Sequence, residues 1–345
     1  MTSPTIAWSQ GRIKLIDQTK LPGKLRYIYC RDIKTLWGAI KRLSVRGAPA
    51  IGVAAGFGVL LAAEQFKGKD RKMFARHLKK ACGYLATSRP TAVNLFNVLD
   101  EMREVIDGNP DSGIPQLKKL IKEKAFEIYE EDRRVCRKMG SYGAKLIRSG
   151  NRVLTLCNAG ALATVDYGTA LGVMYSAKEQ GKKFSVYACE TRPLLQGARL
   201  TTWELMRGKI DTTLICDNMA ATLMKQGKIN AVFAGADRIA LNGDAANKIG
   251  TYNLAVLAKY HKVPFYIVAP LSTFDHAAGS GRDIPIEERR KEEVTRFGGR
   301  TTAPSGVKVY NPAFDVTDHK LITAIITEKG IICPPFIRNI RARCL

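Results

Sequence analysis

The chain has 345 residues, of which 46% are hydrophobic, and a formal net charge of +24. This length allows two domains with sizeable cores, and the hydrophobic content is that of a globular protein rather than a disordered chain. The longest apolar run, Ala48–Ala63, is shorter than the roughly 20 residues that a membrane span needs. We therefore interpret it as a buried helix. Residues 1–20 lack the pattern of a signal peptide.

The positive charge allows two interpretations. An anionic partner, either nucleic acid or a phosphorylated substrate, would account for it, and so would a solvated basic surface. The basic residues are spread over several segments without interleaved aromatic residues, and no RNA-binding or helix-turn-helix signature is present. We expect a solvated basic surface and no nucleic-acid partner.

The chain has 8 cysteines and 4 histidines, with no CxxC, HxxxH or HxH pattern. Cysteines this sparse do not form a disulfide scaffold, and the spacings do not match a structural zinc site. We expect a reduced, cytoplasmic protein that holds no metal.

Residues 1–150 are predicted to form a small N-terminal α+β domain. Three short segments of β character precede several amphipathic helices, and the pattern changes at 149–151, which we take as the boundary to a second domain, 151–345. The segments are Thr5–Trp8, Arg12–Ile16 and Tyr27–Cys30, followed by helical periodicity from Ile33 and a long helix over Ile114–Ile147.

Two arginines in this first part precede predicted helix starts. Arg46 lies just before Pro49, and Arg89 lies just before Pro90. Proline is favourable in the first turn of a helix, and an arginine beside a helix N-terminus makes an anion site. For Arg46, pairing with a surface carboxylate is the alternative.

The second part alternates between short apolar strands and helices. This order predicts right-handed βαβ units and an α/β fold with a parallel sheet. No GxGxxG or P-loop motif is present, so we expect no nucleotide cofactor. The strands are Val153–Leu156, Phe184–Ala188, Thr212–Ile215, Ala231–Ala234 and Pro264–Val268; the helices are Thr164–Lys178, Ala198–Met206, Met219–Lys225 and Tyr252–His261.

Polar residues follow these strands at their carboxyl ends. Cys157 follows the first strand, residues 189–193 with Gln196 beyond follow the second, Cys216 the third, and Asp237 the fourth. Because the carboxyl ends of parallel strands meet at one edge of the sheet, we expect these residues to form one cluster.

Cys157 and Asp237 are the candidate acid–base pair of this cluster. A helix start after Cys157 would lower the pKa of its thiol, and burial would raise the pKa of Asp237 so that it donates a proton near neutrality. The alternatives are a buried inert cysteine and an ion pair between Asp237 and Arg238. The stretch from Asp237 to the next helix is expected to be a polar loop, with Asn247 and Lys248 beside a helix N-terminus that binds an anion. These residues predict proton transfer on a small phosphorylated metabolite.

Eight motifs extend this interpretation. They resemble the 5-methylthioribose-1-phosphate isomerases, a family related to ribose-1,5-bisphosphate isomerase and to the regulatory subunits of translation initiation factor 2B. The motifs are VRGAPAIG (45–52), SRPTAVNL (88–95), CNAGALAT (157–164), ETRPLLQGARLTTWEL (190–205), GADRIALNGDAANKIGTYNLAV (235–256), PLSTFD (270–275), IPIEER (284–289) and NPAFDVT (311–317).

The resemblance implies a Rossmann-like second domain, a homodimer, and conversion of an aldose phosphate to a ketose phosphate in methionine salvage without a cofactor. It places the catalytic cysteine at Cys157 and the catalytic acid at Asp237. It places substrate contacts at Arg46, Gly47, Ala48, Arg89, Gln196, Asn247 and Lys248.

Two departures and two alternatives accompany the resemblance. Leu156 and Cys189 stand where many members have histidine and aspartate, which leaves rate and pH optimum open more than reaction type. A ribose-1,5-bisphosphate isomerase would keep the same catalytic pair. A non-enzymatic subunit related to translation initiation factor 2B would not need this pair.

Overall fold

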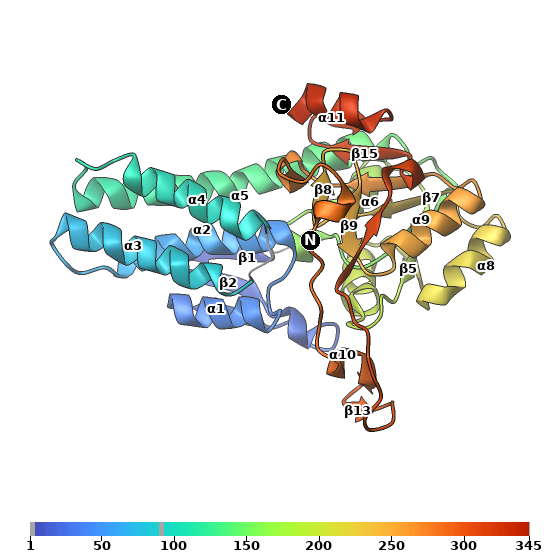
Figure 1. Cartoon of the computed structure of the whole chain (residues 1–345), viewed down its shortest axis with the longest axis horizontal. Coiled ribbons are helices and arrows are strands. Elements are labelled where there is room, and N and C mark those ends of the chain that lie inside the picture. Colours follow the sequence, from blue (N-terminus) through green and yellow to red (C-terminus); the bar gives the residue numbers. More distant parts are fainter. Residues whose placement is uncertain (1–3, 90–92, 345) are drawn as a thin grey trace. The chain divides into compact units, whose positions relative to one another are not determined.

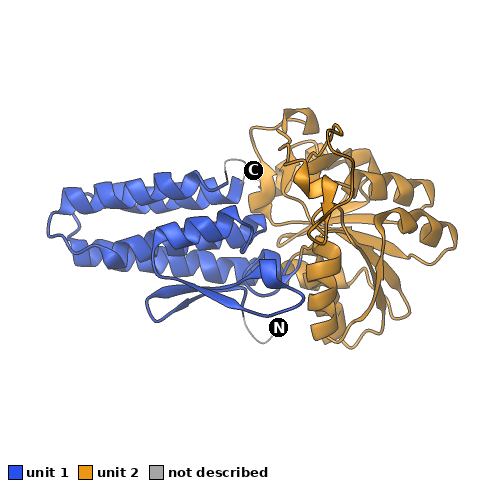
Figure 2. Cartoon of the chain, turned by 90° about the horizontal axis from the view of Figure 1, so that it is seen from below, with its two compact units in different colours: residues 1–137, 160–168 blue, residues 138–159, 169–345 orange. Residues whose placement is uncertain are grey.

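The computed structural model describes residues 4–89 and 93–344, which form two compact units. Unit 1 comprises residues 1–137 and 160–168, and unit 2 comprises residues 138–159 and 169–345 (Figure 2). The chain thus enters unit 2 near the end of a long helix and returns once to unit 1 with a short segment. The two-unit α/β architecture predicted from the sequence is confirmed.

Unit 1 is a three-stranded antiparallel sheet followed by long helices. The predicted N-terminal strands are confirmed, and so is the long helix before the second unit. The elements are β1 (Ile6–Ser9), β2 (Arg12–Ile16), β3 (Tyr27–Cys30), α1 (Ile33–Lys41), α2 (Ala48–Gln65), α3 (Arg71–Ala86), α4 (Val93–Asp107) and α5 (Ile114–Ala144), which crosses the unit boundary.

Helix α2 is the centre of unit 1. It packs against α1, α3 and α4 (Figure 1), and its side chains from Ala50 to Ala63 are buried on every side. Its length and composition would suit a membrane span, but 78% of its apolar window is buried inside the unit. The interpretation of this run as a buried core helix is therefore confirmed.

Unit 2 contains a seven-stranded sheet in the order β16-β15-β10-β7-β4-β5-β6, in which only β16 is antiparallel to its neighbour. The alternation of buried strands and helices predicted from the sequence is confirmed. The elements are β4 (Arg152–Thr155), α6 (Ala170–Glu179), β5 (Ser185–Cys189), the π-helix η3 (Gly197–Thr201), α7 (Thr202–Arg207), β6 (Asp211–Ile215), α8 (Ala220–Lys225), β7 (Ala231–Ala234), α9 (Thr251–Tyr260), β10 (Phe265–Val268), β15 (Ala324–Thr327), β16 (Gly330–Ile332) and α11 (Phe336–Cys344).

A second sheet of unit 2 has the order β11-β8-β9-β14. An arm made of α10 and a small hairpin extends away from the main sheet of this unit (Figure 1). The bounds are β8 (Arg238–Ala240), β9 (Ala245–Lys248), β11 (Phe274–Asp275), α10 (Glu292–Thr295), β12 (Arg296–Phe297), β13 (Arg300–Thr301) and β14 (Phe314–Thr317).

Two local predictions are wrong. The helix expected from Thr164 begins at Ala170, because residues 160–168 pack within unit 1 instead. There the Thr5 N–H donates to the Val165 carbonyl at 2.7 Å, and the Gln18 amide donates to the Leu162 carbonyl at 2.7 Å. The loop expected after Asp237 is instead the hairpin β8–β9, which completes the second sheet.

Candidate active site

The strand order of the main sheet reverses between β4 and β7. From β4 the chain builds outward to β5 and β6, and from β7 it builds in the other direction to β10 and β15. Ligands of open α/β sheets bind beyond the carboxyl ends of the strands at such a reversal. Cys157 follows β4 and Asp237 follows β7, so the predicted catalytic pair lies on the two strands that flank this point.

The ends of these two strands are held together by specific contacts. β4 and β7 pair in parallel up to Thr155 and Phe233, and the Thr155 hydroxyl donates to the Phe233 carbonyl at 2.8 Å. A Cβ atom added to Gly235 would lie 2.9 Å from the Cβ of Ala159. The glycine after β7 therefore allows the loop after Cys157 to pack closely beside it.

The backbone of Cys157 has a left-handed conformation, with φ of 60°, and its side chain is half-buried. Its N–H donates to the Thr191 hydroxyl at 2.8 Å, and its carbonyl accepts from the Thr201 hydroxyl at 2.5 Å. A short 3-10 helix over Ala161–Ala163 follows Cys157, and the α-helix α6 begins at Ala170. The α-helix N-terminus that was expected directly after this thiol therefore lies further along the chain.

Asp237 lies between β7 and β8, and its N–H donates to the Ala246 carbonyl at 2.9 Å. Its neighbour Arg238 forms a salt bridge with Asp275 at 3.0 Å. Arg238, the ion-pair partner considered for Asp237 from the sequence, is thus bound to Asp275. The hairpin fixes the backbone of Asp237 at the edge of the sheet.

Lys248 connects the predicted anion site with the predicted catalytic pair. Its side chain is 6% exposed, and burial lowers the pKa of its amine, opposed by the negative charges of Cys157, Glu293 and Asp237 and reinforced by the positive charge of Arg289. The Lys248 ammonium group interacts electrostatically with both Cys157 and Asp237. Because such interactions weaken with distance, the three groups lie in one region of unit 2. Such a cation can neutralise a bound phosphate.

Asn247 precedes Lys248 on β9 and is also 6% exposed. Its amide donates to the Thr251 hydroxyl at 2.9 Å.

Gln196 is 8% exposed, and within residues 4–89 and 93–344 its Oε1 atom has no hydrogen-bond partner. A buried amide oxygen costs free energy unless it accepts a hydrogen bond. Gln196 thus fits the predicted role of a ligand contact, because a substrate hydroxyl would satisfy it.

The N-terminus of α9 differs from the prediction of a free anion site. The Asp315 carboxylate accepts from the N–H of Gly250 at 2.7 Å and from the N–H of Tyr252 at 3.1 Å. Burial raises the pKa of Asp315 to about 6, opposed by these two hydrogen bonds and by the charge of Lys248. An internal carboxylate therefore occupies the donors that the sequence pattern assigned to a phosphate.

The remaining predicted contacts belong to unit 1. Gly47 is the N-cap of α2 with φ of 90°, and a Cβ atom there would lie 2.4 Å from the Ala163 carbonyl oxygen. The packing of residues 160–168 thus requires glycine at 47. Ala48 is the first residue of α2, and Arg46 and Arg89 are both half-buried. Pro90, predicted to start the next helix, lies outside the described residues.

Sequence reasoning missed four residues around Cys157 and Lys248. Thr191 and Thr201 bind the backbone of Cys157, Asp217 binds the backbone of residues 191 and 192, and Asp315 caps α9. Three of the four lie within or beside motifs that carried the resemblance, but threonine and aspartate are common beside turns, so nothing in the pattern distinguished them.

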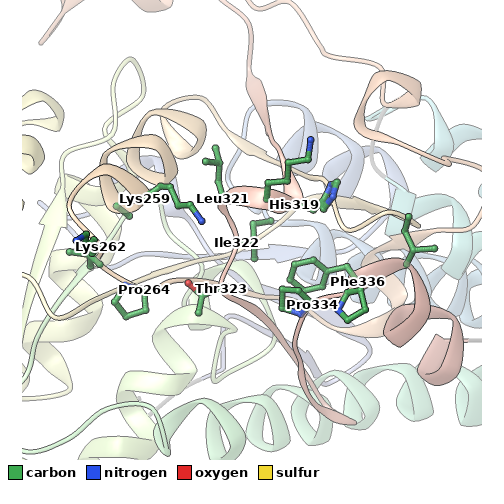
Figure 3. A pocket seen from close by; sticks show the side chains of 14 residues that line it. Lys259, Lys262, Pro264, His319, Leu321, Ile322, Thr323, Pro334 and Phe336 are labelled. Carbon is green, nitrogen blue, oxygen red and sulfur yellow. The ribbon is translucent and has the colours of Figure 1, made fainter.

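Two other features of unit 2 lie outside this site. A pocket of about 830 Å³ is lined by residues that precede β10 and β15 and by residues at the start of α11, including Lys259, Pro264 and Phe336 (Figure 3). It contains none of the predicted site residues. Asp244, Asp318 and His319 could together hold a cation, but the Asp244 carboxylate already accepts from the N–H groups of His319 and Gly281.

Comparisons with known proteins agree with this architecture. Residues 44–334 match the model of the initiation factor 2 subunit family. The chain is 54% identical to the methylthioribose-1-phosphate isomerase of Desulforamulus reducens, with 98% of each chain covered. It is 52% identical to the 5-deoxyribose 1-phosphate isomerase of Moorella thermoacetica, with 97% of this chain and 95% of that protein covered.

Solved structures give the same result. The 5-methylthioribose 1-phosphate isomerase of Pyrococcus horikoshii matches with a TM-score of 0.94 and 45% identity, covering 99% of this chain and 95% of the other. The structure described as translation initiation factor eIF-2B, subunit delta, from A. fulgidus matches with a TM-score of 0.89 and 49% identity over 99% of both chains. The chain therefore belongs to the initiation factor 2 subunit family and, within it, to the isomerases.

Proposed function

We propose that this isomerase converts 5-methylthioribose 1-phosphate to 5-methylthioribulose 1-phosphate in methionine salvage. The observation that carries the proposal is the position of Cys157 and Asp237 after the two strands that flank the reversal of strand order. The names of full-length relatives support the substrate. Lys248 supports binding of the phosphate, because its buried ammonium group lies in the field of both residues.

The substrate explains why an acid is needed. Its anomeric oxygen carries the phosphate, so the sugar ring cannot open by ordinary loss of a hemiacetal proton. In the proposed mechanism Asp237 donates a proton to the ring oxygen as the bond between this oxygen and C1 breaks. A carboxylic acid that is protonated near neutrality suits this role.

The second step moves hydrogen from C2 to C1. In one route the Cys157 thiolate removes the proton from C2, an enol forms, and the thiol returns a proton to C1. In the other route the hydrogen at C2 shifts to C1 as a hydride while Cys157 stabilises the charge. In both routes the 2-hydroxyl becomes the ketone and releases a proton, which balances the proton that Asp237 gave to the ring oxygen. Deuterium at C2 separates the routes, because only the shift retains all of it at C1.

Two related sugar phosphates are alternative substrates, and one of them has specific support. The relative named 5-deoxyribose 1-phosphate isomerase favours a sugar phosphate that differs only in its substituent at C5. Ribose 1,5-bisphosphate would use the same catalytic pair but needs a second anion site at C5. A non-enzymatic role as a subunit related to translation initiation factor 2B is the alternative from another class, since several similar structures carry such a description, but this role would not need the pair of Cys157 and Asp237.

The test is turnover of purified protein on 5-methylthioribose 1-phosphate, 5-deoxyribose 1-phosphate and ribose 1,5-bisphosphate, measured side by side. We expect the highest kcat/KM with the methylthio sugar. Higher kcat/KM with either other sugar would keep the mechanism and replace the substrate. Sedimentation of the same protein tests the expected homodimer.

A further inference from the structure

Two threonines hold the backbone of Cys157 from opposite sides. The Cys157 N–H donates to the Thr191 hydroxyl at 2.8 Å, and the Thr201 hydroxyl donates to the Cys157 carbonyl at 2.5 Å. Both threonines are 0% exposed. The Thr191 hydroxyl thus accepts from Cys157 and the Thr201 hydroxyl donates to Cys157. Both the N–H and the carbonyl of Cys157 are therefore bound by side chains.

Each threonine is held in turn by a second group. The N–H of Thr191 donates to Asp217 at 2.8 Å, and its hydroxyl donates to the Cys189 carbonyl at 3.0 Å. On the other side, the Asn158 amide donates to Thr201 at 3.2 Å and to Glu204 at 2.8 Å. The two threonines therefore have fixed orientations of their own.

The conformation of Cys157 requires such support. Its φ of 60° lies in the left-handed region, which residues other than glycine rarely adopt and which persists only where the surroundings impose it. The direction of the Cα–Cβ bond depends on this conformation. A relaxed backbone would turn the thiol away from its position, and misplacement by about 1 Å can cost about 100-fold in rate.

We propose that Thr191 and Thr201 are positioning residues that hold Cys157 in the left-handed conformation and thereby aim its thiol at the reacting carbon. The proposal rests on the proposed function only in giving this thiol a catalytic role. Both threonine side chains are fully buried, so in this proposal they act through the backbone of Cys157 rather than by contact with the substrate.

The test replaces each threonine by valine, which keeps the shape and removes the hydroxyl, and by serine, which keeps the hydroxyl. Thr327→Val is the matched control. Thr327 is also 0% exposed, and its hydroxyl donates to the Gly330 carbonyl at 3.0 Å and accepts from the Lys329 N–H at 3.2 Å. The control loses the same kind of buried hydrogen bonds away from Cys157.

The first readout is steady-state kinetics with thermal unfolding beside it. We expect Thr191→Val and Thr201→Val to lower kcat by about 100-fold with little change in KM, because the phosphate contacts remain. Both serine variants and Thr327→Val should keep most of kcat. If the valine variants keep kcat, or if Thr327→Val loses as much, the proposal is overturned.

The second readout does not depend on isomerase activity. The rate of alkylation of Cys157 by iodoacetamide is followed across pH by site-resolved mass spectrometry, with the exposed Cys333 as internal reference. We expect a changed rate and pH profile at Cys157 in the valine variants, restored by serine, and no change at Cys333. An unchanged profile at Cys157 would contradict the proposal. Protein that turns over no substrate would instead refute the proposed function.

Discussion

Cys157 and Asp237 follow neighbouring parallel strands, β4 and β7, at the position where the strand order of the sheet reverses. Thr155 and Phe233 are the last paired residues of these strands, so both site residues leave the sheet from the same edge. The arrangement therefore predicts separate and nearly complete losses when either residue is replaced.

Replacement of Cys157 by alanine should lower kcat by at least about 100-fold, the scale of a lost acid–base group. Because the side chain is only half-buried, the fold should remain, as judged by circular dichroism and thermal unfolding. Cys216→Ala is the control, since this exposed cysteine follows β6, at the edge of the sheet. A Cys157→Ala variant with the activity of Cys216→Ala would remove Cys157 from the mechanism.

Asp237→Asn should abolish turnover of a substrate whose ring oxygen needs a proton, because an amide cannot donate as a carboxylic acid does. The control is Asp275→Asn, which weakens the salt bridge to the adjacent Arg238 at 3.0 Å but leaves Asp237 in place. We expect kcat to fall far more in Asp237→Asn than in Asp275→Asn. Similar losses in the two variants would indicate that Asp237 acts only through the local structure.

Lys248 should bind the phosphate through its ammonium charge. This charge should be lost at a lower pH than the charge of an exposed lysine. Burial lowers the pKa of its amine, so as pH rises Lys248 becomes neutral before an exposed lysine does. We expect the inhibition constant of inorganic phosphate to rise on the alkaline side. Lys248→Arg should abolish this rise, since arginine keeps its charge, and Lys248→Met should weaken phosphate binding at every pH.

Lys259→Met is the matched control for these variants, because Lys259 lines the separate pocket before β10 and β15. Its inhibition constant for phosphate should follow that of the unmodified protein across the pH range. If Lys248→Met retains the same alkaline rise, another group is responsible for phosphate binding.

The main sheet was predictable because its strands are short, apolar and separated by helical periodicity, a signal that each segment carries by itself. The predictions around Ala231–Ala234 and Phe265–Val268 match the observed strands. The true start of the helix expected from Thr164, which is Ala170, was not predictable from the sequence. Residues 160–168 have ordinary local sequence, and their path is decided by partners far along the chain, such as Thr5 and Asp132.

In the candidate site, too, features carried by local sequence could be predicted and features decided by distant partners could not. Cys157 and Asp237 were identifiable because strand ends of a parallel sheet meet at one edge. The threonines beside Cys157 were not, because their hydrogen bonds join residues separated by 34 and 44 positions. Asp315 was likewise missed: it caps α9 from the neighbouring strand β14, a contact that a reading of α9 alone does not contain.

Asp132 should make unit 1 less stable as pH rises. Its carboxylate accepts from the Val165 N–H at 2.7 Å. Burial raises the pKa of Asp132 to about 7 from its ordinary 3.8, opposed by this hydrogen bond and reinforced by the charge of Asp166. Since the folded state binds this proton more tightly than the unfolded state, the free energy of unfolding falls as pH rises from about 4 to about 7 and then levels off.

Asp132→Asn removes this dependence while keeping an oxygen that can accept from Val165. We expect the variant to gain stability relative to the unmodified protein as pH is raised from 5 to 8, measured as the difference between their urea midpoints at each pH. Asp111→Asn, at an exposed position, is the control and should show no such trend. Other partly buried acids, including Asp315, are present in all three proteins, so their contribution cancels in the comparison. A constant difference across this range would mean that Asp132 is ionised in the folded protein throughout.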